Sequence, residues 1–234
     1  MSTVVFDIET SAFNFDEFDQ MQKDYLMKSA DREENEELRQ KAREEILGQL
    51  SLWPLTSRVV AIALLNIESG NGFSLFYSDE EVKFEKKDPE HSYTFVGTNE
   101  LNMLTKFWEF ISKFDVFVTF NGRSFDCPFL MLRSGILGIR PSLNLMAGSR
   151  YSMKNHIDLL EELTFHGVTR KFNLDFYCKA FGIESPKSHG ITGYDINEYF
   201  RARRYNEIAQ YCMGDVLATA QLYAKWKYLY EGLK

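Results

Sequence analysis

A seven-residue segment near the amino terminus, TVVFDIE at positions 3–9, places two acidic side chains inside a strand pattern. The segment begins with β-branched residues, and Phe6 and Ile8 then alternate with Asp7 and Glu9. Because successive residues of a strand point to opposite faces, both acids share one face and both apolar side chains share the other. We therefore predict a strand that buries Phe6 and Ile8 and presents two carboxylates together.

Two neighbouring carboxylates in a partly buried place repel one another unless a cation lies between them. Oxygen ligands of this kind suit Mg²⁺ and Mn²⁺. The pattern D-x-E also begins at positions 31, 79 and 88, but only the copy at position 7 lies in an apolar strand. Asp7 and Glu9 are therefore candidate metal ligands.

The rest of the chain reads as an alternation of strands and helices. Strand patterns occur at 58–67, 73–77, 92–96 and 115–120, and the first two are expected to form a hairpin through the turn at Gly70. Residues 78–91 and 183–194 are expected to form loops. Helical patterns occur at 99–114, 125–137, 157–163, 173–182 and 206–230. Strand, tight turn and helix in succession indicate an α/β fold.

Charge is distributed unevenly along the chain of 234 residues, whose net charge is -7. Residues 14–48 hold 11 acids and 6 bases, a balance of -5, so most of the imbalance lies in one segment. We interpret residues 14–50 as an exposed helical insertion. Its charged surface is either a solvated face or a binding site for a protein partner.

The composition excludes several classes of protein. With 44% hydrophobic residues the chain can form a sizeable core, and no stretch approaches the length of a membrane span. The amino terminus lacks the apolar run of a signal peptide, so we expect a cytoplasmic protein without membrane contact. Cys127, Cys178 and Cys212 form no C-x-x-C pair and are expected to be free thiols.

Two further acids lie in settings that suit a site. Asp126 follows the strand at 115–120 and the Asn121-Gly122 turn, in the first turn of a predicted helix. It either favours the helix dipole or belongs to a site at the carboxyl end of the strand. Asp215 lies in the long carboxy-terminal helix, with Tyr211 one turn earlier on the same face. A surface acid and a core tyrosine are the alternative interpretation.

Taken together, FDIET, NGRSFD and YCMGD resemble the three exonuclease motifs of the DEDD superfamily, in the branch with a tyrosine in the third motif (DEDDy). Within that branch the chain resembles the 3′-5′ exonuclease domain of family B DNA polymerases and its stand-alone relatives. The resemblance spans residues 3–218, and HIDL at 156–159 also fits it. The insertion at 14–50 departs from the compact domain. We expect a free-standing nuclease.

The resemblance implies an RNase H-like α/β fold with a mixed, mainly five-stranded sheet and helices on both faces, in a single domain over residues 1–234. It also implies hydrolysis of phosphodiester bonds with two divalent cations, Mg²⁺ or Mn²⁺. In that pattern Asp7 bridges both ions, Glu9 and Asp215 complete one site, and Asp126 supports the other. Tyr211 orients the attacking water, so these five residues are the expected catalytic set.

Substrate contacts are expected from few groups, namely Thr10, Asn121 and Phe125. Each has a structural alternative, as a strand end, a turn former and a core residue respectively. Basic residues between the second and third motifs could follow the nucleic-acid backbone, although an ordinary surface charge is the preferred interpretation of each one (Arg133, Arg140, Arg150, Lys154, Arg170, Lys171 and Lys187). Asp158 is interpreted as a helix cap in preference to an accessory acid.

The leading hypothesis is therefore a metal-dependent 3′-5′ exonuclease acting on 3′ ends of single-stranded or frayed DNA, with RNA left open. Two alternatives remain. The first is a catalytically silent nucleic-acid-binding module of the same fold, which would normally have lost one of the four acids. The second is an RNase H-like endonuclease, which gives no reason for Tyr211. Oligomeric state does not follow from the sequence.

Overall fold

The computed structural model describes residues 1–148, 155–184, 193 and 195–231, and within them the strands form a seven-stranded sheet. Its order is β4-β5-β3-β2-β1-β6-β7. Strand β1 pairs antiparallel with β2 and parallel with β6, which places it inside the sheet. The strands are β1 (Thr3–Ala12), β2 (Ser57–Asn66), β3 (Asn71–Tyr77), β4 (Val82–Lys87), β5 (Ser92–Thr98), β6 (Val116–Thr119) and β7 (His156–Asp158).

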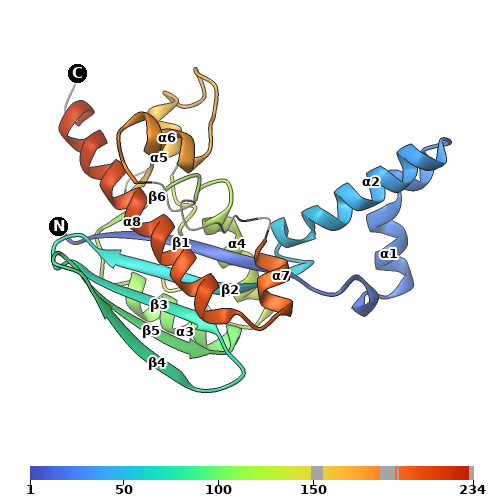
Figure 1. Ribbon diagram of the computed structural model, residues 1–234, viewed down its shortest axis with the longest axis horizontal. Coiled ribbons are helices and arrows are strands. Elements are labelled where there is room, and N and C mark those ends of the chain that lie inside the picture. Colours follow the sequence, from blue (N-terminus) through green and yellow to red (C-terminus); the bar gives the residue numbers. More distant parts are fainter. Residues whose placement is uncertain (149–154, 185–192, 194, 232–234) are drawn as a thin grey trace.

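Helices cover both faces of the sheet, with α8 in front of it and α3 behind it in Figure 1. The described helices are α1 (Gln20–Met27), α2 (Glu36–Gln49), α3 (Glu100–Ile111), α4 (Asp126–Ile136), α5 (Leu159–Leu163), α6 (Leu174–Ala180), α7 (Ile196–Arg201) and α8 (Tyr205–Tyr230). None of these described helices combines the length and the apolar character needed to cross a lipid bilayer. The α/β class predicted from the sequence is confirmed.

The alternation in β1 decides which core each side chain joins. Phe6 and Ile8 are 1% and 3% exposed and join the cluster formed with α3 and α4, where Phe6 contacts Phe107 at a ring distance of 5.6 Å. Val5 points to the opposite face and joins the cluster under α8. Asp7 and Glu9 share that second face because they alternate with Phe6 and Ile8. The predicted strand and its two faces are confirmed.

The expectation of about five strands is wrong because two short strands extend the sheet. Residues 78–91 were expected to be a loop, but they contain β4, which pairs antiparallel with β5. Phe84 stacks on Phe95 of β5 at 4.6 Å, and this contact outweighs the charged residues around it. Charged side chains on an edge strand also discourage pairing with other chains.

The second additional strand is β7, where the sequence predicted a helix beginning at residue 157. Phe117, Val118 and Thr119 of β6 pair in parallel with His156, Ile157 and Asp158, and the helix begins only at Leu159. Pairing with β6 determines that this segment is a strand, because three residues are too few to show the alternation that marks a strand in the sequence. Helix α7 was likewise not predicted.

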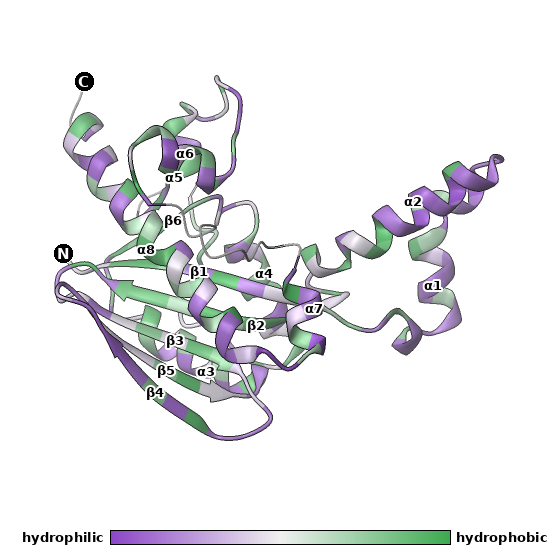
Figure 2. Cartoon of the chain, viewed as in Figure 1, coloured by the Kyte–Doolittle hydropathy of each residue, from purple (hydrophilic) through white to green (hydrophobic). Residues whose placement is uncertain are grey.

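The charged segment at 14–50 forms a helical arm, as predicted. Helices α1 and α2 extend away from the sheet, and Figure 2 shows that their residues are largely hydrophilic. No residue of α2 is buried, and Met21 and Tyr25 of α1 are 81% and 78% exposed. The predicted contact of this arm with a protein partner stays a prediction.

Hydrogen bonds hold the base of the arm against β1. The Phe13 amide donates to the Thr56 carbonyl at 2.9 Å, which joins the two ends of the insertion. The Thr10 hydroxyl of β1 donates to the Ser51 carbonyl at 2.6 Å. The residues around Ser51, at the carboxy-terminal end of the arm, therefore have a defined place beside β1.

The three cysteines are free and buried, as the sequence predicted. Cys127 lies in α4, Cys178 in α6 and Cys212 in α8. Burial raises the pKa of all three thiols, so each remains protonated at neutral pH and behaves as a small apolar side chain.

His156 in β7 is a buried imidazole whose protonation should make stability depend on pH. Its side chain is in hydrogen-bond contact with the Thr119 hydroxyl at 2.8 Å. Burial, aided by the positive charge of Arg123, lowers the pKa of His156 to about 4. The unfolded chain therefore binds a proton at this residue between pH 6.5 and about 4, whereas the folded chain does not.

We expect the free energy of unfolding to fall, through this residue, as the pH is lowered across that window. The slope is at most about 1.4 kcal/mol per pH unit. Urea unfolding of wild type and His156→Gln at several pH values isolates the effect, because the other titrating groups are shared. The free energy of unfolding of wild type should therefore decrease relative to that of the variant as the pH falls. Parallel pH curves would contradict this prediction.

Candidate active site

Three carboxylates converge where α8 crosses β1. One ligand oxygen each from Asp7, Glu9 and Asp215 lies within 4.8 Å of the other two. Asp7 and Glu9 lie two residues apart on the face of β1 that α8 covers, and Asp215 comes from the middle of α8. Residues separated by more than 200 positions in the chain thus form one acidic cluster.

Helix α8 is held against β1 by apolar contacts and by one thiol. Cys212 and Val216 of α8 are fully buried. The Cys212 thiol donates to the Asp7 carbonyl at 3.4 Å and lies 3.7 Å from an Asp7 carboxylate oxygen. On the strand side, a register shift between Glu9 and Thr10 interrupts the β1–β2 ladder. A bulge of this kind re-aims side chains next to it.

Asp126 stands beside this cluster and is bonded to the same strand. It is the first residue of α4 and is 3% exposed. One of its carboxylate oxygens accepts the Ile8 amide at 3.0 Å, so Asp126 connects β1 to α4. The three-carboxylate cluster does not include it, but its negative charge raises the pKa of both Asp7 and Glu9.

The pKa values of three of the four acids are raised above their ordinary range. Burial is the first cause that raises the pKa of Asp7 and Glu9 well above the ordinary range, and mutual repulsion of the carboxylates adds to it. The pKa of Asp126 is raised to about 7, again mainly by burial. Among the described residues no lysine or arginine forms an ion pair with these three acids. A cation that bound between them would relieve both effects.

Tyr211 lies one helical turn before Asp215 and faces the cluster. Its side chain is 9% exposed. Burial, the charges of Asp215, Glu9 and Asp7, and a hydrogen bond with Asp215 all raise the pKa of its phenol. The hydroxyl therefore stays protonated and can donate a hydrogen bond beside the carboxylates.

A cleft of about 810 Å³ opens onto the cluster. Glu9, Tyr211 and Asp215 line it together with the three predicted substrate residues, Thr10, Asn121 and Phe125. Thr10 and Asn121 also have structural roles, because the Thr10 hydroxyl bonds to Ser51 and Asn121 adopts a positive φ of 64° in its turn. The end of the arm contributes a further part of the wall (Glu45, Gly48, Gln49, Ser51 and Leu52), which the sequence did not predict.

Asp158 holds the loop that carries Asn121 and leads to Asp126. Its buried carboxylate accepts the amides of Asn121 and Arg123 at 2.9 Å each, and also that of Leu160 at 3.0 Å. The last bond is the helix cap expected from the sequence. The other two were not predicted, because they join positions about 36 residues apart that only the β6–β7 pairing brings together.

The basic residues between the second and third motifs divide into several groups. Arg133 is 5% exposed and forms a bidentate pair with Glu100, at 2.9 and 2.7 Å, so its expected contact with nucleic acid is wrong. Lys171 pairs with Glu161 at 2.6 Å, and Arg170 lies 5.0 Å from the Phe172 ring. Arg150, Lys154 and Lys187 lie outside the described residues.

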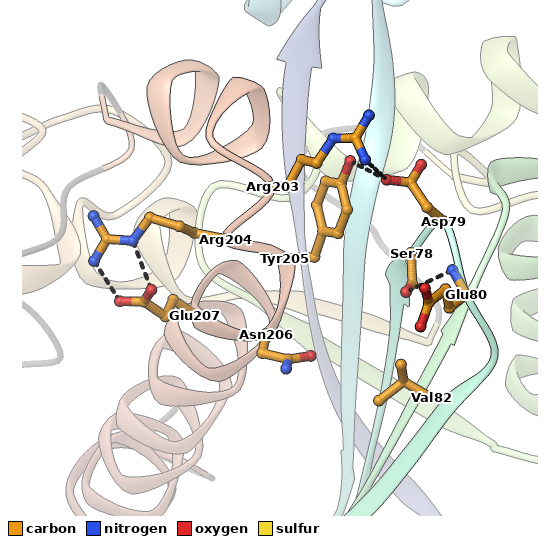
Figure 3. A pocket seen from close by; sticks show the side chains of 9 residues that line it. All are labelled: Ser78, Asp79, Glu80, Val82, Arg203, Arg204, Tyr205, Asn206 and Glu207. Atoms are coloured by element: carbon orange, nitrogen blue, oxygen red, sulfur yellow. Dashed lines mark hydrogen bonds and ion pairs between the residues drawn. The ribbon is translucent and has the colours of Figure 1, made fainter.

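A second pocket, of about 500 Å³, lies between the β3–β4 connection and the start of α8 (Figure 3). Its charged side chains largely pair with one another. Arg203 and the Tyr205 hydroxyl both contact Asp79, at 3.4 and 3.1 Å, and Arg204 forms two bonds to Glu207 at 2.6 Å each. These basic groups are thus already engaged by acidic partners.

Comparison with known proteins agrees with this arrangement. The fold is similar to the RNase H-like fold of a solved family B DNA polymerase from the hyperthermophilic archaeon Pyrobaculum calidifontis, with a TM-score of 0.57 and 20% identity. The similarity covers 96% of this chain and 24% of the polymerase, so the chain spans about a quarter of that protein's length. This likeness concerns the fold.

Residues 53–234 match a family described as predicted 3′-5′ exonucleases related to the exonuclease domain of PolB. The match covers well over half of the chain, and the chain belongs to this family. The resemblance stated from the sequence is thereby confirmed at the level of the family. Asp126, Tyr211 and Asp215 lie within the matched range, whereas Asp7 and Glu9 precede it.

Removal of the Asp158 carboxylate should destabilise the protein more than loss of an ordinary helix cap. Asp158→Ala leaves three amides without their acceptor, and we expect a loss of about 2–4 kcal/mol. Asn99→Ala removes one amide acceptor, at the start of α3, and should cost about 1 kcal/mol. Urea unfolding of both variants measures the difference. Equal losses would show that the loop does not depend on Asp158.

Proposed function

We propose that this protein is a metal-dependent 3′-5′ exonuclease that removes nucleotides from the 3′ end of single-stranded or frayed DNA, with RNA as a second substrate to be tested. The observation that carries the proposal is the convergence of Asp7, Glu9 and Asp215 within 4.8 Å, beside Tyr211 in an open cleft. Membership of a family of predicted 3′-5′ exonucleases supports the direction of cleavage.

The donor set fits divalent ions such as Mg²⁺ or Mn²⁺, since it consists of carboxylate oxygens with no adjacent cationic partner described for Asp7 or Glu9. We propose that Asp7, Glu9, Asp215 and Asp126 hold two such ions. Bound there, the ions would neutralise the charge of a phosphodiester and lower the pKa of a bound water. They would also offset the repulsion between an acidic cleft and an anionic substrate.

The protein's own groups then have distinct tasks. The protonated Tyr211 hydroxyl forms a hydrogen bond with the attacking water and fixes its direction toward phosphorus. Water adds to phosphorus and the bond to the 3′-oxygen of the preceding nucleotide breaks, which releases a nucleoside 5′-monophosphate and a chain with a free 3′-hydroxyl. Asn121 and Phe125, on the cleft wall, contact the terminal nucleotide, and Thr10 lies at the end of β1 beside it. We propose that residues 1–234 act as one such domain, with 14–50 as an insertion.

The assay uses 5′-labelled single-stranded DNA and RNA and a circular single-stranded DNA, each with Mg²⁺, Mn²⁺ or EDTA. Wild type should shorten the linear substrates from the 3′ end only when a metal is present, and it should leave the circle intact. Asp7→Asn should lose at least about a hundredfold in rate, because it removes a shared metal ligand. Asp16→Asn changes an exposed acid of the arm in the same way and should behave like wild type.

Each contrary outcome points to a different function. Cleavage of the circle would favour an endonuclease, and no cleavage of any substrate would favour a nucleic-acid-binding module without activity. Metal binding is followed separately by thermal unfolding. Mn²⁺ should raise the unfolding midpoint of wild type more than that of Asp7→Asn. Equal shifts in the two proteins would show that Asp7 is not a metal ligand.

Tyr211→Phe separates orientation of water from metal binding, because it keeps the ring and removes only the hydroxyl. We expect kcat to fall by about tenfold to a hundredfold. The Mn²⁺-induced shift of the unfolding midpoint should remain that of wild type. Wild-type kcat would exclude Tyr211 from the reaction, and loss of the thermal shift would show that the phenol supports the metal site itself.

A further inference from the structure

An exposed pair of stacked aromatic rings lies at the start of α6, one just before the helix and one within it. Phe172 and Phe176 have ring centroids 4.8 Å apart at an interplanar angle of 26°. They are 37% and 58% exposed. Large apolar rings that stay open to solvent in a soluble domain often mark a binding surface.

One ring of this pair borders the candidate active-site cleft. Phe172 and the neighbouring Leu174 line the same cleft as Glu9 and Tyr211, and Phe176 stacks on Phe172. Glu9 and Tyr211 are each 9% exposed, whereas Phe172 and Phe176 are 37% and 58% exposed. The two rings are therefore open to solvent beside a cleft whose polar residues are largely covered.

The protein holds these rings in place without any ligand. On the inner side of α6, Cys178 is fully buried, and Tyr177 packs edge-on against Phe120 at 5.6 Å. The Asn173 side chain accepts the Phe176 amide at 3.0 Å and caps the helix. A rigid aromatic surface loses little conformational entropy when a flat group stacks on it.

A positive charge accompanies the rings. The Arg170 guanidinium lies 5.0 Å from the Phe172 ring, and among the described interactions it forms no ion pair. Lys171 and Lys179 nearby are already paired, with Glu161 and Asp175. Arg203 and Arg204 of the second pocket are engaged in the same way (Figure 3). Arg170 is thus a basic group near the cleft that remains available for an anion.

We propose that Phe172 and Phe176 form a stacking surface for nucleobases of a single-stranded chain, on the 5′ side of the nucleotide being removed, with Arg170 contacting a backbone phosphate. The inference rests on the proposed function and adds a substrate-binding site to it. Every nucleobase has a flat π-face, so such a surface accepts any sequence, and a guanidinium beside it suits the phosphate chain. A strand that approaches from this solvent-exposed side meets the rings before it reaches the acids.

The test measures KM and kcat on 5′-labelled single-stranded oligonucleotides that carry one abasic site at position two, three, four or five from the 3′ end. In wild type, one or two of these positions should raise KM by about tenfold, because a stacked base is missing. The Phe172→Ala/Phe176→Ala double variant should show a similar rise on the intact oligonucleotide and no further rise on the abasic ones. Its kcat at saturation should equal that of wild type.

Two controls distinguish stacking from a structural effect. Phe172→Trp keeps a π-face and should retain the KM of wild type, whereas Phe172→Leu keeps an apolar side chain without one and should not. Tyr228→Ala removes an aromatic ring that is 88% exposed near the end of α8, and it should leave KM unchanged. Arg170→Gln should weaken the dependence of KM on salt.

A double variant with the KM and the abasic-site sensitivity of wild type would overturn the proposal. If wild type itself cleaves nothing, the proposed function fails. Fluorescence anisotropy of the labelled oligonucleotide then measures binding and tests the stacking surface separately. Binding that is lost in the double variant but kept in Tyr228→Ala would support the surface. Equal binding by all three proteins, or no binding by wild type, would overturn it.

Discussion

The repulsion among closely spaced carboxylates at the crossing of β1 and α8 is the constraint on which the rest of this structure depends. Asp7, Glu9 and Asp215 lie within 4.8 Å of one another, and Asp126 adds its charge from α4. Such an arrangement destabilises a folded chain unless other contacts hold it. The two apolar clusters on opposite faces of β1 supply those contacts, because the same strand that presents the acids also buries Phe6 and Ile8.

The arm formed by residues 14–50 is tied to this arrangement at its base only. The Thr10 hydroxyl of β1 bonds to the Ser51 carbonyl, and the last turn of α2 forms part of the cleft wall. The outer helices remain exposed and largely hydrophilic (Figure 2). An insertion near the first acidic motif thus contributes to the shape of the cleft while most of its length stays in solvent.

Long-range pairing explains the features that sequence patterns missed. Arg133 looked like a surface charge available to nucleic acid, but it lies buried against Glu100 because α3 and α4 pack side by side. Asp158 looked like a simple cap, but β6 and β7 bring it to the amides of Asn121 and Arg123. The charged residues of β4 gave it the pattern of a loop. The contacts of Phe84 with Phe95 and Phe76, which join this strand to the sheet, depend on the tertiary structure.

The sequence by itself determined which residues are acidic, which face of each strand or helix carries them, and the order of the motifs. Those properties are local, because they follow from periods of two and 3.6 residues. Asp7 and Glu9 on one face of a strand and Tyr211 one turn before Asp215 could therefore be predicted. Only the tertiary structure decided that these acids meet beside one cleft, that Asp126 bonds to Ile8, and that Phe172 lines the same cleft. These distances depend on how distant elements pack, and no local period contains that information.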